Sequence, residues 1–272
     1  MPSVPTQVVV DQMGRTVVAP VWPQRVVSLV PSQTELLLDL GLGDRLVGRT
    51  RFCVHPADQV SRVAVVGGTK QINFATVERL QPDLIVGNKE ENERETILRL
   101  AERYPVWLSD VVTLDDALAM IRQVGRLVGE PERADALAEE VAQRLAALPR
   151  VQPPRRVAYL IWRKPWMAAG GHTFINSMLA HCGLVNVFAG PELGRYPQVS
   201  LEALAAAQPE LVFLSSEPYS FRERHRLELQ AALPASTVML VDGEMFSWYG
   251  SRLRLAADYL ARLVAEIGAL QR

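Results

Sequence analysis

The chain repeats one order of expected elements, and this repeat limits its fold more than any other feature does. A short apolar run at 25–30 leads into a helical segment from Thr34, and a second run at 156–162 leads into another at 173–183. Later in each half, a Gln-Pro-acid-Leu opening starts the apolar runs QPDLIVGN (81–88) and QPELVFLSS (208–216). Strands that alternate with helices indicate parallel sheets, whose ligand sites lie beyond the carboxyl ends of the strands. We therefore expect an α/β protein built from two similar halves, although chance similarity between α/β segments stays open.

A long helical stretch separates the two halves. Apolar residues recur at helical spacing from Leu118 to Val128 and from Ala134 to Leu148, and Pro131 stands at a favoured first-turn position between them. The pattern predicts an N-terminal α/β lobe over 1–112, connecting helices over 113–150 and a C-terminal α/β lobe over 151–272. Each lobe should hold a central, mostly parallel β-sheet flanked by helices. Because a long helix is stiffer than a loop, this connector predicts a small change in lobe angle on ligand binding.

Composition and charge exclude several classes of protein. Lys and Arg number 29 against 30 Asp and Glu, a balance that does not favour nucleic-acid binding. No apolar run reaches the ~18 residues of a membrane-spanning helix, and the first residues show no signal-peptide pattern. We therefore expect a soluble, unexported chain as written, with a removed leader left open. The two cysteines, Cys53 and Cys182, are expected to be unpaired thiols, although one bridge between them is allowed.

Aromatic and cationic residues gather in loops that follow expected strands. Stacking and cation–π contacts need such residues, and the two Trp and two cations at 162–166 are hard to explain as core. For the charged stretch that holds Lys89, a helix N-terminus with favourable acids is the alternative. Gly67-Gly68 would also let backbone N–H groups approach an anion, although an ordinary turn explains the pair equally well. The residues expected to contact a ligand on this ground are Arg51, Phe52, Lys70, Lys89, Trp162, Arg163 and Trp166.

One of these loops also contains a cysteine and a histidine two positions apart, Cys53 and His55. Thiolate and imidazole are zinc ligands, but two groups make an incomplete site. Both interpretations, a metal site and an ordinary loop, stay open.

With these segments in view, the sequence resembles the periplasmic binding proteins that serve ferric siderophores, haem and cobalamin, and the cobalamin-binding branch most of all. The resemblance covers nearly the whole chain. It lies in VVVDQMGRTVVAP, in PQRVVSLVPSQTELLLDLGLGDRLVG, in VGGTKQINFATVERLQPDLIVGN, in GGHTFINSMLAHCGLVNVF and in RYPQVSLEALAAAQPELVFL. It implies two lobes joined by a long backbone α-helix, with the ligand in the cleft between them. It also implies ligand contacts in two further loops, at Arg195 and Tyr196 and at Trp248, Tyr249 and Arg252.

The resemblance implies a partner as well, the permease of an ABC transporter. Family members dock through one Glu on each lobe, which corresponds here to Glu202 on the second lobe. On the first lobe the corresponding position is Ala75, and Glu78, three residues on, could substitute. The family is periplasmic, whereas the missing leader and the missing Glu leave a cytoplasmic role open.

The expected function is non-catalytic binding of a metal chelate: a cobalamin or other corrinoid, a ferric siderophore or a haem. No catalytic residue and no covalently bound cofactor are expected. The alternative is a cytoplasmic tetrapyrrole- or metal-handling protein, such as a chelatase-like enzyme, for which Cys53, His55 and Glu90 or Glu91 are the nearest candidates. That alternative rests on likeness of fold alone.

Overall fold

The computed structural model describes residues 5–270 and divides the chain into two compact units. The first unit contains the chain up to Val111, Asp115–Ala142 and Tyr249–Arg252. The second contains Val112–Leu114, Gln143–Trp248 and the chain from Leu253 onward. Each unit is a mixed α/β assembly around one mostly parallel sheet, so the predicted fold class is confirmed.

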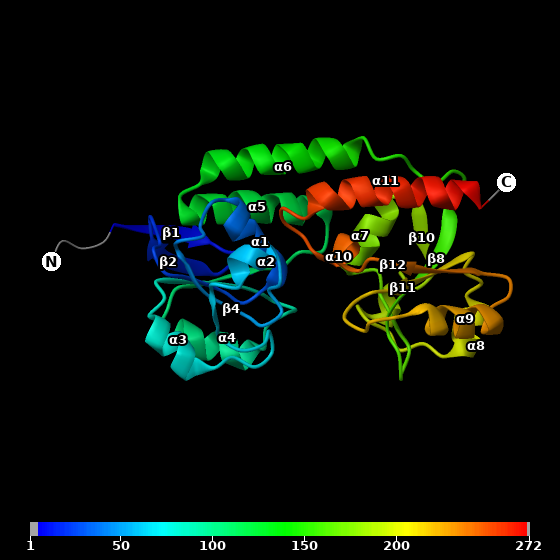
Figure 1. Cartoon of the computed structure of the whole chain (residues 1–272), viewed down its shortest axis with the longest axis horizontal. Helices are drawn as coiled ribbons and strands as arrows, with labels where there is room; N and C mark the ends of the chain where they lie inside the picture. The colour runs from blue at the N-terminus through cyan, green and yellow to red at the C-terminus, as the bar shows by residue number, and fades with distance from the viewer. Residues whose placement is uncertain (1–4, 271–272) are drawn as a thin grey trace. The chain divides into compact units, whose positions relative to one another are not determined.

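The first unit contains a five-stranded parallel sheet of order β5-β4-β3-β6-β7 and a separate hairpin, β1–β2. One sheet face packs on α3 and α4 through Val27, Ile85, Val77 and Leu100, and Figure 1 shows both helices on the same side of these strands. The elements up to the connector are β1 Thr6–Val10, β2 Thr16–Pro20, β3 Val26–Ser28, α1 Pro31–Asp39, β4 Leu46–Arg49, α2 Ala57–Val60, β5 Ala64–Val65, α3 Phe74–Leu80, β6 Leu84–Asn88, α4 Arg94–Ala101, β7 Val106–Ser109, α5 Leu114–Val128 and α6 Pro131–Ala146.

The second unit holds a parallel sheet of order β10-β8-β11-β12, to which β9 adds antiparallel to β8. Successive side chains alternate between its faces. Leu160 and Leu214 meet Leu229 of α9, whereas Tyr159 and Phe213 meet Phe246 of α10. Figure 1 accordingly shows α8 and α9 on one side of the strands and α10 and α11 on the other. The elements are β8 Arg155–Trp162, β9 Met167–Ala168, α7 Phe174–His181, β10 Leu184–Asn186, η1 Pro191–Leu193, α8 Leu201–Ala206, β11 Leu211–Ser215, α9 Glu223–Ala232, β12 Thr237–Val241, α10 Glu244–Ser247 and α11 Leu253–Ala269.

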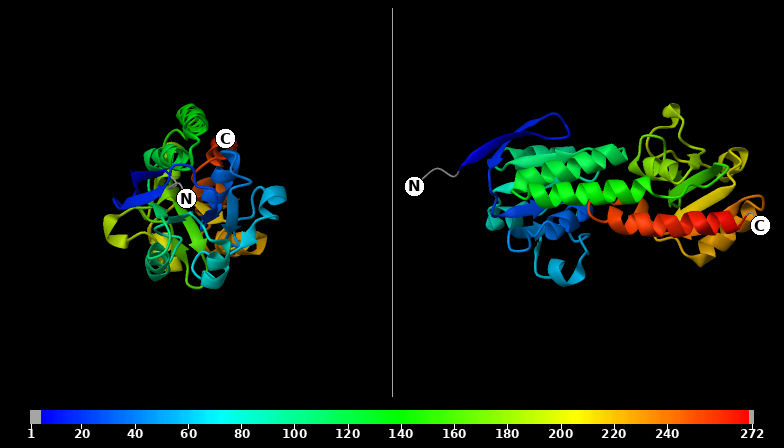
Figure 2. Two further views of the ribbon diagram at one scale, coloured as in Figure 1. Left: turned by 90° about the vertical axis from the view of Figure 1, so that its left-hand side faces the viewer. Right: turned by 90° about the horizontal axis from the view of Figure 1, so that it is seen from above.

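The turn of the β1–β2 hairpin forms hydrogen bonds to the outer edge of β7. Arg15 Nη2 donates to Val106 O at 3.0 Å, and Leu108 N–H donates to Asp11 Oδ2 at 3.2 Å. Gln12 N–H donates to Leu108 O at 3.1 Å, and its side chain accepts from Asp110 N–H at 3.1 Å. The Asp-x-x-Gly-Arg segment therefore occupies the edge groups that an unpaired strand would expose. Figure 2 shows the hairpin, in dark blue, at the margin of the first unit.

Two local predictions differ from the structure. The helix expected from Thr34 begins at Pro31, because proline, lacking an N–H, is well suited to the first turn of a helix. Around Arg51 the sequence indicated only a turn-rich loop, whereas the structure has a short strand, β4, before Arg51 and two more short elements, α2 and β5, after it. These elements span only two to four residues each, too few for a periodic apolar pattern to form.

No helix in residues 5–270 is both long enough and apolar enough to cross a lipid bilayer.

Candidate ligand-binding site

In the first unit, Arg51 and Phe52 lie just past the carboxyl end of β4. Arg51 N–H donates to Gly67 O at 2.8 Å, and the guanidinium lies 5.7 Å from the centre of the Phe52 ring. A Cβ on Gly68 would lie 3.2 Å from Phe52 Cε2, so the absence of a side chain there makes room for the ring. Phe52 keeps 52% of its surface exposed, which leaves an aromatic face with an adjoining cation available to a ligand.

The two lysines predicted for this site are both engaged by neighbours in the same unit. Lys70 Nζ donates to Glu90 O at 2.5 Å, and Lys89 Nζ lies 2.6 Å from Asp110 Oδ2. Both side chains remain about half exposed, so each could still turn toward an anionic group. Nearby, desolvation raises the pKa of the Glu91 carboxyl, with the positive charge of Lys70 acting against it.

A buried polar network forms the base of these loops, and sequence reasoning missed it. Asn92 Oδ1 accepts from Asn88 N–H at 2.9 Å, while Asn92 Nδ2 donates to Leu29 O at 3.2 Å and to Thr69 O at 3.0 Å. Asn88 Nδ2 donates to Ser109 Oγ at 3.0 Å. These side chains tie together the loops after β3 and β6. Two asparagines four apart at a strand end could have signalled this role.

Tyr249 and Arg252, predicted as ligand contacts, are buried in the first unit. Arg252 forms a two-pronged ion pair with Glu35 of α1, with Nε–Oε2 at 2.8 Å and Nη2–Oε1 at 2.7 Å. Arg252 is 6% exposed and Glu35 8% exposed. Burial raises the pKa of the Tyr249 phenol well above its usual value, and the charge of Glu91 adds to the effect. The guanidinium fork that would receive a ligand carboxylate thus holds a carboxylate of the protein itself.

In the second unit, four aromatic rings form a continuous run that begins at the last residue of β8 and continues past the carboxyl ends of β8 and β11. Trp162 meets the edge of Tyr219 at a centroid distance of 5.6 Å, and Tyr219 meets Phe221 at 4.8 Å. Trp166 stacks on Phe221 with an interplanar angle of 2°. Trp162 is 40% exposed, whereas Phe221 is 5% exposed. We call Trp162, Tyr219, Phe221 and Trp166 the aromatic run.

Charged side chains fix this run in place. Arg163 lies 5.6 Å from the Trp166 ring and pairs with Glu228 of α9 at 2.7 Å. Below Tyr219 and Phe221 lies the buried His225, whose Nδ1 accepts from Arg222 N–H at 3.0 Å. Burial, reinforced by the charge of Arg224, lowers the pKa of His225 and favours its neutral form. Sequence reasoning placed Trp162, Arg163 and Trp166 here but missed Tyr219 and Phe221, which follow a strand in the same way.

The remaining predicted contacts of the second unit fall into two settings. Tyr196 is 38% exposed, in a loop whose Arg195 O accepts from Gly170 N–H at 2.7 Å. Trp248 is 8% exposed, and its Nε1 donates to Glu217 Oε1 at 3.0 Å. Tyr196 is therefore accessible, whereas Trp248 packs as part of the unit.

Among the residues that the structure describes, the cysteine–histidine pair joins no cluster of further metal-binding groups. Cys53 is buried, and Thr34 and Thr50 lie 3.0 and 3.2 Å from its sulfur. Burial raises the pKa of its thiol, which opposes the thiolate that a metal needs. Within residues 5–270 no group of three or more His, Cys, Asp and Glu is arranged to hold a metal ion.

The two predicted docking acids are exposed. Glu202 stands in the first turn of α8, and a hydrogen bond from Ser200 lowers its carboxyl pKa. Glu78 of α3 pairs with Arg103 Nη2 at 2.8 Å, and Ala75 is exposed one turn before it.

Comparison with known proteins places this geometry in context. The family model described as periplasmic binding protein matches residues 26–233. A vitamin B12-binding protein of Pectobacterium atrosepticum is 28% identical over 255 residues, covering 90% of each chain. Among solved structures, the vitamin B12 binding protein BtuF of Vibrio cholerae has a TM-score of 0.74 at 24% identity, covering 90% of this chain and 97% of that one. The haem-binding protein RhuT from Roseiflexus has a TM-score of 0.76 at 22% identity, covering 89% and 98%. At these identities the two structures show the fold alone.

Proposed function

Because the chain belongs to the periplasmic binding protein family, we propose that it binds a flat metal chelate without chemical turnover, and that this ligand is a corrinoid of the cobalamin type. One observation carries the proposal: the aromatic run stands past the strand ends of the second sheet, with Trp162 exposed. Corrinoids offer broad faces that such rings can cover. The curated relatives named vitamin B12-binding proteins, which align with nine-tenths of this chain, favour a corrinoid over a haem.

The residues proposed to contact the ligand are a subset of those the sequence suggested. Phe52 and Arg51 present an aromatic face and a cation on the first unit. On the second, Trp162, Trp166 and Tyr196 supply aromatic surface, with Arg163 over the Trp166 ring. Lys70, Lys89, Arg163 and Arg195 supply charge around them. We assign Trp248, Tyr249 and Arg252 to support of the site, because each is buried. Cys53 and His55 receive no metal-binding role in this proposal.

A binding titration tests the proposed ligand class. Purified protein is titrated with cyanocobalamin, haemin and ferrichrome by isothermal calorimetry, with absorption spectra recorded in parallel. We expect saturable 1:1 binding of cyanocobalamin, at least tenfold tighter than binding of the other two. Tighter binding of haemin or ferrichrome would overturn the corrinoid assignment and keep the binding function. Insertion of a divalent metal into a porphyrin by the protein would instead support the chelatase alternative.

A matched pair of tryptophan variants tests the proposed contact surface. Trp162→Ala should weaken cyanocobalamin binding at least tenfold, because one aromatic contact contributes about 0.5–1.5 kcal/mol beyond the area that it buries. Trp22→Ala removes another exposed tryptophan, which lies in the first unit and belongs neither to the aromatic run nor to the Arg51–Phe52 contact, and should leave the affinity within twofold. Equal effects of the two substitutions on cyanocobalamin affinity would contradict the placement of Trp162 at the ligand.

We further propose that the protein acts outside the cytoplasm and delivers its ligand to an ABC-type permease. Glu202 is exposed and ionised at a helix start, in keeping with a docking role. On the first unit Glu78 could dock to the permease only after breaking its ion pair with Arg103. Exposed pairs of this kind contribute only ~0–1 kcal/mol. The test measures how far the ligand-loaded protein stimulates ATP hydrolysis by the transporter. We expect Glu202→Gln to lose this stimulation while its affinity for the ligand stays unchanged.

A further inference from the structure

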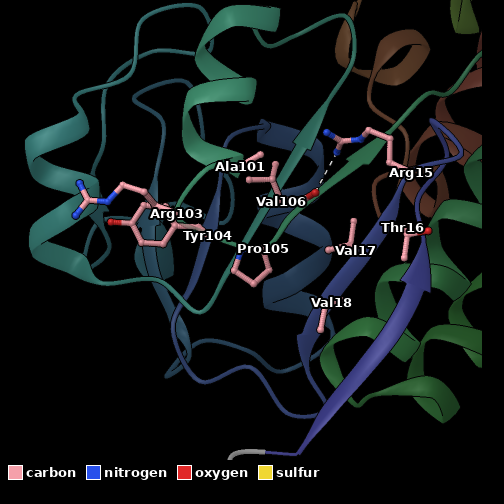
Figure 3. Close-up of a pocket in the computed structure, with 9 residues that line it drawn as sticks. All are labelled: Arg15, Thr16, Val17, Val18, Ala101, Arg103, Tyr104, Pro105 and Val106. Carbon is pink, nitrogen blue, oxygen red and sulfur yellow. Dashed lines mark hydrogen bonds between the residues drawn. The ribbon is translucent and has the colours of Figure 1, made fainter.

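A groove of about 390 Å³ runs along the hairpin of the first unit, away from the candidate ligand site. Its walls are residues 15–18, which lead into and form part of β2, and residues 101 and 103–106, which lie between the end of α4 and the start of β7 (Figure 3). The groove therefore lies at the amino end of β7, whereas the residues proposed to bind the chelate follow the carboxyl ends of strands. Its volume falls within the ~300–1,000 Å³ of ordinary ligand pockets.

One wall of the groove is an unpaired strand edge. Asp11 N–H donates to Arg15 O, and Val21 N–H donates to Pro5 O, so the pairs 11–15 and 5–21 are hydrogen-bonded ones. In an antiparallel ladder these alternate with non-hydrogen-bonded pairs, which include Val8↔Val18. The backbone N–H and C=O of Thr16 and Val18 therefore point outward from β2. Within the part of the chain that the structure describes, β2 pairs with β1 alone and no other group takes up these positions.

The chemistry of the groove is apolar at its base and cationic at its rim. Val17 and Val106 are buried, and Pro105 and the half-exposed Val18 extend this apolar surface. Arg15 is fixed by Asp11 and by Val106 O, and Figure 3 draws the second of these bonds. Arg103 is 62% exposed, and its side chain could leave Glu78 for another carboxylate at little cost.

We propose that this groove binds an extended peptide segment of a partner protein, which adds to the β2 edge as a third strand and places a carboxylate beside Arg103. Outward backbone donors and acceptors on alternate residues, about 6.6–6.8 Å apart, match the repeat of an extended chain. Strand addition obtains affinity from such main-chain bonds and specificity from pockets for alternate side chains. This binding function is separate from chelate binding and does not depend on it.

Acetylated hexapeptides of alternating Val and Thr test the proposal. In one set Glu replaces each position in turn, and in a matched set Gln does so. Binding to the full chain is followed by hydrogen–deuterium exchange and by fluorescence anisotropy of labelled peptides. At least one Glu peptide should bind tenfold tighter than its Gln counterpart and slow exchange at Thr16 and Val18 at least tenfold. The amides of Thr6 and Val8, on the outer edge of β1, should not change. No protection of Thr16 and Val18 at millimolar peptide overturns the proposal.

Two proline substitutions at directly opposite positions separate strand addition from simple anion binding. Val18→Pro removes an outward N–H from β2 and should abolish peptide binding, whereas Val8→Pro does the same on β1 and should leave binding within twofold. Both positions resemble that of Pro20, which already stands in a non-hydrogen-bonded pair of β2. Arg103→Gln should remove the preference for Glu over Gln. Binding that survives Val18→Pro but not Arg103→Gln would identify an anion site and reject strand addition.

Discussion

At the residue scale, the ion pair of Arg252 and Glu35 joins positions 217 residues apart and is buried on both sides. Removing one partner leaves a buried charge without its counter-ion, which typically costs about 3–5 kcal/mol. We expect Arg252→Ala to lower the free energy of unfolding by that amount in urea. Arg144→Ala, which breaks the exposed contact with Asp258, should cost less than about 1 kcal/mol. Similar losses for both variants would contradict this role.

Asp11 is the residue that holds the turn of the β1–β2 hairpin against the edge of β7. Its carboxylate accepts from the N–H groups of Met13, Arg15 and Leu108. Asp11→Ala leaves these donors unsatisfied, at about 1–3 kcal/mol for each one that stays buried. We expect lower stability and faster amide exchange at Leu108. Asp44→Ala, at an exposed position, is the matched control and should change neither measurement.

The buried cysteine of the second unit predicts an alkaline loss of stability. Burial raises the pKa of Cys182 from 9.0 to about 12, so above pH 9 the unfolded chain releases a proton that the folded chain keeps. Stability should therefore fall as pH rises from 9 toward 12, by up to about 1.4 kcal/mol per pH unit for this group. Cys182→Ala should show a shallower fall in urea denaturation between pH 8.5 and 10.5. An identical slope in the variant would refute the contribution.

At the element scale, Gly170 fixes the loop that carries Arg195 and Tyr196. A Cβ on Gly170 would lie 2.2 Å from Gly194 O and 3.0 Å from Arg195 O, so Gly170→Ala must displace that backbone. We expect a loss of about 1–3 kcal/mol, as for other overpacked sites, and weaker chelate binding. Gly268→Ala, in α11 with nothing within 4 Å of its Cβ, should instead stabilise by up to about 1 kcal/mol. Thermal unfolding and calorimetry measure both effects.

The sequence was informative about elements wherever a pattern was long enough. The stripes of α5 and α6 and the apolar runs of β6, β8 and β11 were predictable, because burial imposes periodicity or continuous apolar character. Aromatic residues after strand ends indicated Phe52 and Trp162. The partners were not predictable: Glu35 beside Arg252, and Glu217 beside Trp248, depend on tertiary packing between distant segments. A residue type can show that a buried polar side chain needs a hydrogen-bonding partner, but not whether a ligand or another residue of the protein is that partner.

At the scale of the whole molecule, one of the points at which the chain passes from the first unit to the second lies inside α6, between Ala142 and Gln143. A continuous helix resists bending more than a loop does, so we expect a small conformational change on ligand binding. Small-angle scattering with and without cyanocobalamin should give radii of gyration that agree within about 1 Å, far less than a wide closure would require. A larger compaction would show that the connector bends.

The assignment of Tyr249–Arg252 to the first unit also bears on how the protein is made. During synthesis the amino-terminal half leaves the ribosome long before this segment does, and Glu35 has no Arg252 to pair with until 217 further residues have been translated. Nascent chains released before residue 252 should therefore remain sensitive to protease even in their amino-terminal half. Maturation of that half would then depend on translation of this distant segment.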